Sequence, residues 1–198
     1  MGKPQLVLDA GGVVVTNFPE SFWMALARQA GSTAEELKLF FHRELKEPLW
    51  TGKIGEPEFW ERIVRRYPGV DPQRARSDFL AGLKLLPAAE RLPGLRERFD
   101  VHLLSNHRPE WILDVLRPVL HCFSTMTISS EAGVCKPDPG IYRLAGAKLP
   151  AGAPVVFVDD QEKNLAPARE IGWLTLLADE EGGWVGKLER LASGGDAG

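Results

Sequence analysis

Three short apolar runs, each followed by a polar side chain, constrain most strongly what this chain can fold into. The runs lie at residues 5–8, 101–104 and 155–158 and are followed by Asp9, Ser105 and Asp159. Continuous apolar runs of this length are typical of parallel strands that are buried on both faces. Segments with helical spacing follow the later runs, as at 111–116 and 141–145. This alternation predicts an α/β fold built on a parallel sheet.

Two further strands are expected at 125–128 and 174–177. The stretch after the first strand differs, because four amphipathic helical segments follow one another there without a strand. They are expected at residues 18–30, 33–45, 56–67 and 71–85. The simplest interpretation is a core formed by residues 1–16 and 88–198, interrupted by a helical insertion at 17–87. The tail 193–198 is rich in glycine and polar residues, and we expect it to be disordered.

Helix boundaries can also be placed from local signals. Ser32 and Glu35 have the spacing of a capping box. In this motif the side chain of each residue accepts a hydrogen bond from the backbone N–H of the other. Pro57 and Pro72 suit the first turn of a helix, where no backbone N–H is needed. Asp138 followed by Pro139 is expected to start another helix.

Charge and composition exclude several classes of partner. The net charge is −3 and the sequence pI is about 5.9, so the attraction that drives nonspecific binding to nucleic acid or to anionic membranes has no source. No apolar run reaches the roughly 18 residues needed to cross a bilayer. We therefore expect a cytoplasmic protein without nucleic acid or membrane partners and with reduced cysteines. The oligomeric state cannot be read from the sequence.

Chemically coherent residues lie at the predicted strand ends. Ligands of open parallel sheets bind beyond the carboxyl ends of the strands. The residues at these ends, together with a lysine that precedes a helix, are Asp9, Ser105, Asn106, Asp159, Asp160 and Lys136. Carboxylates suit Mg²⁺, which also binds substrate phosphate. A lysine beside it neutralises a phosphoryl group. We expect Asp9 to be the nucleophile that forms an aspartyl phosphate.

The sequence also resembles a known family, the haloacid-dehalogenase (HAD) superfamily. Four of its motifs occur in order: DAGGVV at 9–14, LLSN at 103–106, KPDPGIY at 136–142 and FVDDQEKNLAPAREIG at 157–172. The branch it resembles most contains α-glucose-1-phosphate phosphatases and the N-terminal phosphatase domain of soluble epoxide hydrolase. The resemblance implies a Rossmann-like core with an inserted helical cap. It also implies a Mg²⁺-dependent phosphatase acting on a small phosphorylated metabolite, such as a sugar phosphate.

Residue roles follow from the resemblance. It implies that Asp9 is the nucleophile and a Mg²⁺ ligand, that the Gly11 carbonyl and Asp160 are further ligands, and that Asp159 acts through water or as an additional ligand. Ser105 and Asn106 would contact the phosphoryl group, and Lys136 would bridge Asp9 and phosphate. Trp50, expected in a loop between helices, serves equally well as a substrate contact or as a packing residue.

Gly11 departs from the family pattern. Most phosphatases of the family have an aspartate there, which protonates the leaving group. Such help is worth roughly 10²–10⁴ in rate. Three hypotheses follow: the substrate has a good leaving group, another residue such as His107 or Glu20 supplies the proton, or the protein binds phosphate without catalysis.

Other interpretations remain open for single residues. Asp159 with Glu162 has the spacing of a helix cap, and Ser105 could cap the helix that contains Trp111. A 2-haloacid dehalogenase would keep Asp9 as nucleophile, but it would have no use for the adjacent Asp159 and Asp160.

Overall fold

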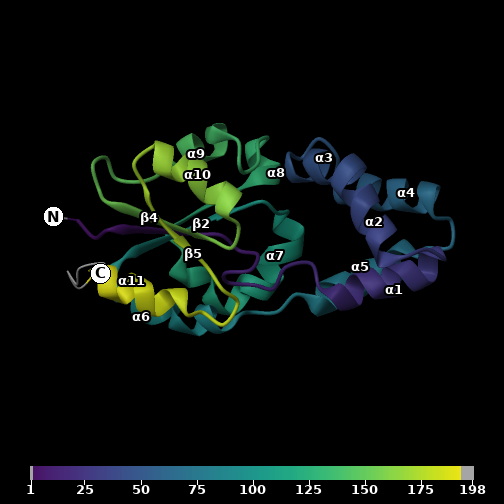
Figure 1. Ribbon diagram of the computed structural model, residues 1–198, viewed down its shortest axis with the longest axis horizontal. Coiled ribbons are helices and arrows are strands. Elements are labelled where there is room, and N and C mark those ends of the chain that lie inside the picture. Colours follow the sequence, from purple (N-terminus) through teal and green to yellow (C-terminus); the bar gives the residue numbers. More distant parts are fainter. Residues whose placement is uncertain (1, 193–198) are drawn as a thin grey trace.

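The computed structural model describes residues 2–192 and contains a five-stranded sheet in which every strand is parallel to its neighbours (Figure 1). The strands are β1 (Gln5–Leu8), β2 (Asp100–Ser105), β3 (Thr125–Ile128), β4 (Val155–Asp159) and β5 (Leu174–Leu177). Their order across the sheet is β3-β2-β1-β4-β5. The predicted α/β class and all five predicted strands are confirmed. The expectation for residues 193–198 concerns positions outside the described range.

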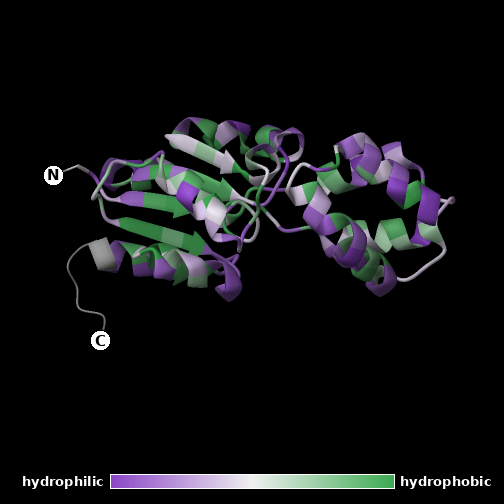
Figure 2. Ribbon diagram, turned by 90° about the horizontal axis from the view of Figure 1, so that it is seen from above, coloured by the Kyte–Doolittle hydropathy of each residue, from purple (hydrophilic) through white to green (hydrophobic). Residues whose placement is uncertain are grey.

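Helices cover both faces of this sheet. The helical segments of the core are η2 (Pro87–Arg91), α6 (Leu92–Arg98), α7 (Pro109–Leu116), η3 (Arg117–Cys122), α8 (Ser129–Ala132), α9 (Pro139–Gly146), α10 (Glu162–Glu170) and α11 (Trp184–Ala192). Successive residues of a strand point to opposite faces. Val7 therefore packs with Ile141 of α9 and Leu165 of α10, whereas Leu6 and Leu8 belong to the cluster formed with α6, α7 and α11. Figure 2 shows these strands as a mainly hydrophobic layer between helices.

The central strand fixes where a ligand can bind. β1 lies between β2 and β4, and the chain proceeds outward on one side through β2 and β3 and on the other through β4 and β5. A crevice forms where the strand order reverses in this way, outside the carboxyl ends of the strands. Asp9 directly follows β1, and Asp159 is the last residue of β4.

The first part of the stretch between β1 and β2 forms a separate lobe, here called the helical block (Figures 1 and 2). Its elements are α1 (Glu20–Ala30), α2 (Ala34–Phe40), the π-helical η1 (Phe41–Leu45), α3 (Lys46–Trp50), α4 (Glu56–Arg66) and α5 (Pro72–Gly82). The four predicted helical segments are present. The loop predicted around Trp50 is wrong, because α3 continues to this residue. Leu45 and Leu49, four residues apart, are both buried, and Pro48 lies early enough in α3 to be tolerated.

Helix starts agree with the local signals except at one position. Pro57, Pro72 and Pro139 all lie in first turns, and Asp138 accepts a hydrogen bond from the Gly140 backbone N–H. The capping box of α2 is formed by Thr33 and Glu36, one residue later than predicted. The Ser32 hydroxyl instead donates to the Glu36 carboxylate.

Two chain segments, which hydrogen-bond to each other, and one tryptophan connect the helical block to the core. The Thr16 backbone N–H donates to the Lys84 carbonyl at 2.9 Å, and the Leu86 N–H donates to the Val14 carbonyl at 2.8 Å. Trp111 of α7 is 1% exposed and packs within the apolar cluster of the helical block. Trp111 is thus part of a core helix but packs with the helical block. The division into domains at 1–16, 17–87 and 88–198 stays a prediction. Within residues 2–192 no helix is long and apolar enough to cross a membrane.

Candidate active site

A cavity of about 510 Å³ lies between the carboxyl edge of the sheet and the helical block, and we call it the aspartate cleft. Core residues that line it include Asp9, Gly11, Asn17, Asn106, His107, Lys136, Gln161 and Lys163. Residues of the helical block on the opposite side include Glu20, Lys38, His42, Lys46 and Trp50. The cleft therefore opens where the reversal of strand order predicts a ligand site.

Lys136 lies between two carboxylates at the floor of this cleft. Its Nζ is 2.8 Å from Asp9 Oδ2 and 2.6 Å from Asp159 Oδ2. The side chains of Lys136 and Asp159 are both 0% exposed, and that of Asp9 is 9% exposed. Asp9 Oδ1 also accepts from the Ala10 backbone N–H at 2.6 Å. Buried charges persist when they are paired and hydrogen-bonded in this way.

The electrostatics of the three groups are coupled. Burial raises the pKa of Asp9 to about 7, against the attraction of Lys136, and Asp159 adds to the rise. Burial alone would lower the pKa of Lys136, but the attraction of Asp9 and Asp159 outweighs it and raises that pKa. Lys136 is therefore a fixed ammonium group. A divalent cation beside Asp9 would favour the ionised carboxylate.

Asp159 uses both of its oxygens within the protein. Oδ2 accepts from Lys136, while Oδ1 accepts from the Gln161 backbone N–H and from Asn164 Nδ2, each at 2.9 Å. The alternative of a capping box with Glu162 does not hold, because the N-cap residue of α10 is Gln161 and the Glu162 carboxylate pairs with Arg169. Asp159 is thus placed to orient Lys136.

Asp160 approaches the loop after β1. Its Oδ2 accepts from Asn17 Nδ2 at 2.9 Å. Burial raises its pKa, and the hydrogen bond from Asn17 acts against the rise. Gly12 has φ +71°, and a Cβ at this position would lie 2.4 Å from Asp160 Oδ2. Only glycine allows the loop to run this close to the carboxylate.

The three aspartates fit a hard divalent cation. Asp9, Asp159 and Asp160 each offer a carboxylate oxygen, and these oxygens lie within 4.8 Å of one another. An all-oxygen donor set is the kind that Mg²⁺ prefers. Asp9 and Asp160 are the better candidate ligands, since both are less buried than Asp159, which is fully buried and accepts three hydrogen bonds.

Asn106 and Ser105, the predicted phosphate contacts, are placed differently. Asn106 lines the cleft. Its side chain forms two hydrogen bonds with the Lys136 backbone: Nδ2 donates to the Lys136 carbonyl at 2.8 Å, and Oδ1 accepts from the Lys136 N–H at 2.7 Å. Ser105 is 1% exposed and is not among the residues that line the cleft. It does not cap α7, whose N-cap residue is Arg108. Its contact with phosphate stays a prediction.

Trp50 and His107 form the apolar side of the cleft. Their ring centroids are 5.5 Å apart, and Trp50 also packs against Trp111 at 6.1 Å. Trp50 thus both lines the cleft and packs in the helical block. Burial lowers the pKa of His107 to about 3, so its imidazole is neutral at pH 7, and the one N–H that remains is too weak an acid to protonate a leaving group. Glu20, the other candidate, lies at the rim and pairs with Lys38.

Several cleft residues were not predicted from the sequence. Asn164 is part of the last quoted motif, so its spacing from Asp159 could have identified it. Lys163 lies in the same motif, directly before Asn164, whereas Asn17 and Lys46 lie outside the quoted motifs. Lys46 reaches the cleft only through the packing of the helical block against the core.

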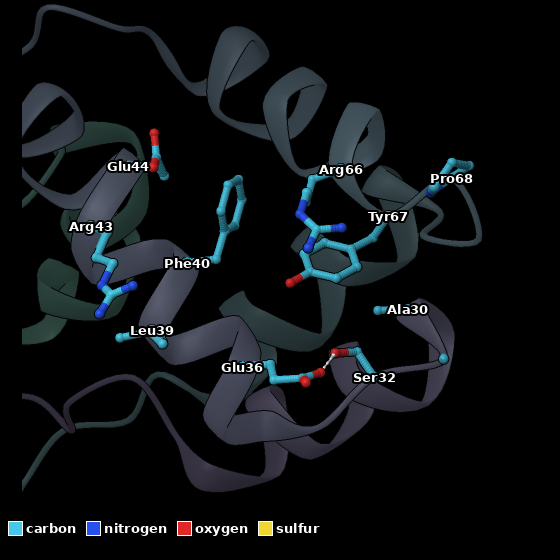
Figure 3. A pocket seen from close by; sticks show the side chains of 11 residues that line it. Ala30, Ser32, Glu36, Leu39, Phe40, Arg43, Glu44, Arg66, Tyr67 and Pro68 are labelled. Carbon is cyan, nitrogen blue, oxygen red and sulfur yellow. Dashed lines mark hydrogen bonds between the residues drawn. The ribbon is translucent and has the colours of Figure 1, made fainter.

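A second cavity of about 530 Å³ lies on the helical block (Figure 3). All its lining residues fall between positions 30 and 68, and none of the aspartates is among them. Arg43 and Arg66 share it with Glu36 and Glu44, and the Arg66 guanidinium lies 5.1 Å from the centre of the Tyr67 ring. It lacks the mixture of carboxylates and lysine found in the aspartate cleft.

Comparison with protein families gives a match for residues 53–172, to the haloacid dehalogenase-like hydrolase family. Among curated proteins, bifunctional epoxide hydrolase 2 of Rattus norvegicus is 36% identical over 70 residues, which are 35% of this chain. The chain spans only 13% of the length of that relative.

Solved structures support the fold across nearly the whole chain. The HAD family enzyme bt-2542 from Bacteroides thetaiotaomicron aligns with a TM-score of 0.81 and 22% identity, covering 95% of this chain and 99% of that one. The same enzyme in complex with magnesium and inorganic phosphate aligns with a TM-score of 0.78 and 22% identity, covering 94% and 99%. At this identity the likeness concerns the fold.

Proposed function

Since the chain belongs to the haloacid dehalogenase-like hydrolase family, we propose that it is a Mg²⁺-dependent phosphatase that hydrolyses a small phosphorylated metabolite through an aspartyl phosphate on Asp9. The observation that supports the proposal is that Asp9, which lines the aspartate cleft together with Lys136, lies close to both Lys136 and Asp160. Asp9 Oδ2 lies 2.8 Å from the Lys136 ammonium group, and an Asp160 oxygen lies within 4.8 Å of an Asp9 oxygen. An isolated strand-end aspartate would need neither partner.

Asp9 and Lys136 have complementary roles in the proposed reaction. An ionised Asp9 oxygen attacks phosphorus, the bond to the leaving oxygen breaks, and water later hydrolyses the aspartyl phosphate. Lys136, held by Asp159 and Asn106, stays protonated and faces the phosphoryl oxygens as charge moves toward the leaving group. These groups are fixed before substrate arrives, so little reorganisation is needed.

The proposed ligands of Mg²⁺ are Asp9, the Gly11 carbonyl and Asp160. Asp159 would act through water or as an additional ligand. The bound ion would neutralise negative charge on the phosphoryl oxygens. The oxygen donor set supports this choice of metal, as does the magnesium complex of bt-2542.

Asn17 bears on the missing acid at position 11. A Cβ on Gly11 would lie 2.7 Å from Asn17 Oδ1, so the Asn17 amide lies beside the place that an aspartate side chain would take. An amide cannot protonate a leaving group at pH 7. With His107 neutral, this favours a substrate with a good leaving group, such as a sugar 1-phosphate.

The decisive experiment is hydrolysis of p-nitrophenyl phosphate and of a panel of phosphorylated metabolites, with Mg²⁺ and with a chelator. Hydrolysis that needs Mg²⁺ and is lost in Asp9→Asn supports the proposal. Turnover that survives in Asp9→Asn contradicts it. Chloride release from a 2-haloacid in the presence of chelator would point to the dehalogenase alternative.

A second experiment tests the leaving-group argument. We expect Gly11→Asp to raise turnover of an alkyl phosphate such as glycerol 1-phosphate relative to p-nitrophenyl phosphate, by up to about 10². The substitution can fit, since the close atom is the movable end of Asn17. An unchanged ratio would mean that proton donation does not limit turnover.

The noncatalytic alternative is favoured by one observation: position 11 has no carboxyl side chain, and the side chain beside it, Asn17, is an amide. It predicts that calorimetry detects binding of phosphate with Mg²⁺ while no member of the substrate panel is hydrolysed. Any Mg²⁺-dependent, Asp9-dependent turnover excludes it.

A further inference from the structure

Three basic side chains line the aspartate cleft without an acidic partner. They are His42 of η1, Lys46 at the start of α3 and Lys163 of α10. Among the described residues, no carboxylate forms an ion pair with any of them, whereas Lys38 in the same cleft pairs with Glu20 and Lys136 pairs with Asp9 and Asp159. They come from two regions, since His42 and Lys46 belong to the helical block and Lys163 to the core.

The three groups are close enough to repel one another. Burial lowers the pKa of Lys46, and the charge of Lys163 lowers it further. Burial also lowers the pKa of His42, with added repulsion from Lys46 and Lys163. The fold therefore holds like charges together at a cost that an anion between them would relieve.

None of these three residues belongs to the group proposed to hold the metal. With one divalent cation, the charges of Asp9, Asp159, Asp160 and Lys136 sum to zero. Lys46 and Lys163 are therefore not needed to balance that group and are available to anionic groups of the substrate. The cleft of about 510 Å³ is in the range that holds a small molecule, which leaves room for a group beyond the phosphoryl.

The cavity of Figure 3 offers a contrast. Arg43 and Arg66 there share the cavity with Glu36 and Glu44, so acidic side chains of the protein already accompany the cations. The aspartate cleft also contains the acidic side chains of Asp9 and Glu20, but these pair with Lys136 and Lys38, not with Lys46 or Lys163.

We propose that the substrate carries a second anionic group, a carboxylate or a second phosphate, which binds between Lys46, Lys163 and His42 while the transferred phosphoryl group lies against Asp9. This inference rests on the proposed phosphatase function and specifies its substrate class. Because the two sides of the subsite belong to different regions, the anion would also join the helical block to the core.

The test compares substrates that differ only in the second group. 3-Phosphoglycerate and glycerol 1-phosphate differ by a carboxylate in place of a hydroxymethyl group, and fructose 1,6-bisphosphate and fructose 6-phosphate differ by one phosphate. We expect kcat/KM to favour the doubly anionic member of at least one pair by about tenfold or more, the scale of a charge-assisted contact. The pair that discriminates tells carboxylate from phosphate.

Variants then locate the preference. Lys46→Met and Lys163→Met should each reduce the ratio of the two kcat/KM values by about tenfold. Lys53→Met is the matched control, because Lys53 belongs to the same helical block but pairs with Glu47 at 2.5 Å and does not line the cleft. Its ratio should equal that of the wild type.

Two failures are distinguishable. If both pairs are hydrolysed with ratios near one, or if Lys46→Met lowers both members equally, the second-anion site is wrong while the phosphatase stands. If nothing is hydrolysed, the phosphatase is wrong, and calorimetry of the same pairs with Mg²⁺ decides the subsite. If the two members of a pair differ tenfold in Kd and this difference disappears in Lys46→Met, the second-anion subsite is supported. If their Kd values are equal, the subsite is overturned.

Discussion

The floor of the aspartate cleft and its helical side hold charge in different ways. On the floor, Lys136 and Asp159 are 0% exposed and contact each other at 2.6 Å. On the helical side, His42 is exposed and Lys46 is half-buried, and neither forms an ion pair with a described residue. Both regions face the same cavity, so the difference is in how complete each is without a ligand.

This difference separates two tasks. A floor whose charges are mutually satisfied keeps its geometry in the absence of ligand, as the proposed transfer of a phosphoryl group requires. A side with unpaired cations is completed by whatever anion binds there. We infer that the floor determines the reaction and the helical side determines the substrate.

Removing the nucleophile should have the largest effect. Asp9→Asn keeps the shape of the floor but removes the attacking oxygen, so we expect turnover to fall by about 10⁴-fold or more, the scale seen when other enzymes lose their nucleophile. Hydrolysis of p-nitrophenyl phosphate with Mg²⁺ measures it. A melting temperature close to that of the wild type serves as the control for folding, and residual activity above a tenth of the wild-type value would contradict the role of Asp9.

Lysine substitutions on the two sides compare them directly. Lys136→Met leaves Asp9 and Asp159 buried without their cation, and we expect a loss of about 3–5 kcal/mol in the free energy of unfolding. Lys46→Met removes repulsion from Lys163, so its stability should lie within about 0.5 kcal/mol of the wild type. Urea unfolding at pH 7 measures both. Equal losses would show that the two sides do not differ as described.

His107, where the two regions meet, should make stability depend on pH. Its pKa is about 3 in the folded protein and about 6.5 when unfolded. Between these values only the unfolded state binds the proton, so the stability that His107 contributes is present above pH 6.5 and is lost as pH falls, by up to about 1.4 kcal/mol per pH unit.

Asp9 acts in the opposite direction. Its pKa is raised to about 7, so between about pH 7 and 4 the folded state takes up the proton and stability from Asp9 is lost as pH rises. Comparison of the wild type with His107→Gln separates the two contributions. Below pH 6 we expect a steeper loss of stability in the wild type, measured by urea unfolding, and parallel curves would show that His107 is not held neutral.

The smallest effect is expected at the edge of the floor. Asn17→Ala removes the 2.9 Å hydrogen bond to Asp160, and loss of such a contact to a metal ligand typically weakens metal affinity by 10- to 100-fold. We expect the lower end, about tenfold, because Asn17 is exposed. Titration of activity against Mg²⁺ measures it. Gln161→Ala is the comparison, since its contact with Asp160 is longer, at 3.4 Å, and should matter less.

Errors in the sequence-based predictions have identifiable physical reasons. Trp50 was expected in a loop between helices, yet Leu45 and Leu49 are both buried and the chain stays helical as far as Trp50. The capping box was placed one residue early because Ser32 and Thr33 are both good N-cap residues, and backbone geometry selects between them.

The sequence alone determined the α/β class, the five strands and the helical insertion, because apolar periodicity and strand-end residues are local properties of a chain. It also marked Asp9, Lys136 and Asp160, since the carboxyl ends of parallel strands must meet at one edge. Only the tertiary structure showed that Asp159 pairs with Lys136, that Asn17 lies beside Gly11, and that Lys46 and Lys163 line the same cleft. Lys136 and Asp159 belong to segments that pack together only in the folded core, the Asn17 contact depends on how the loop after β1 turns, and Lys46 comes near Lys163 only because the helical block packs against the core.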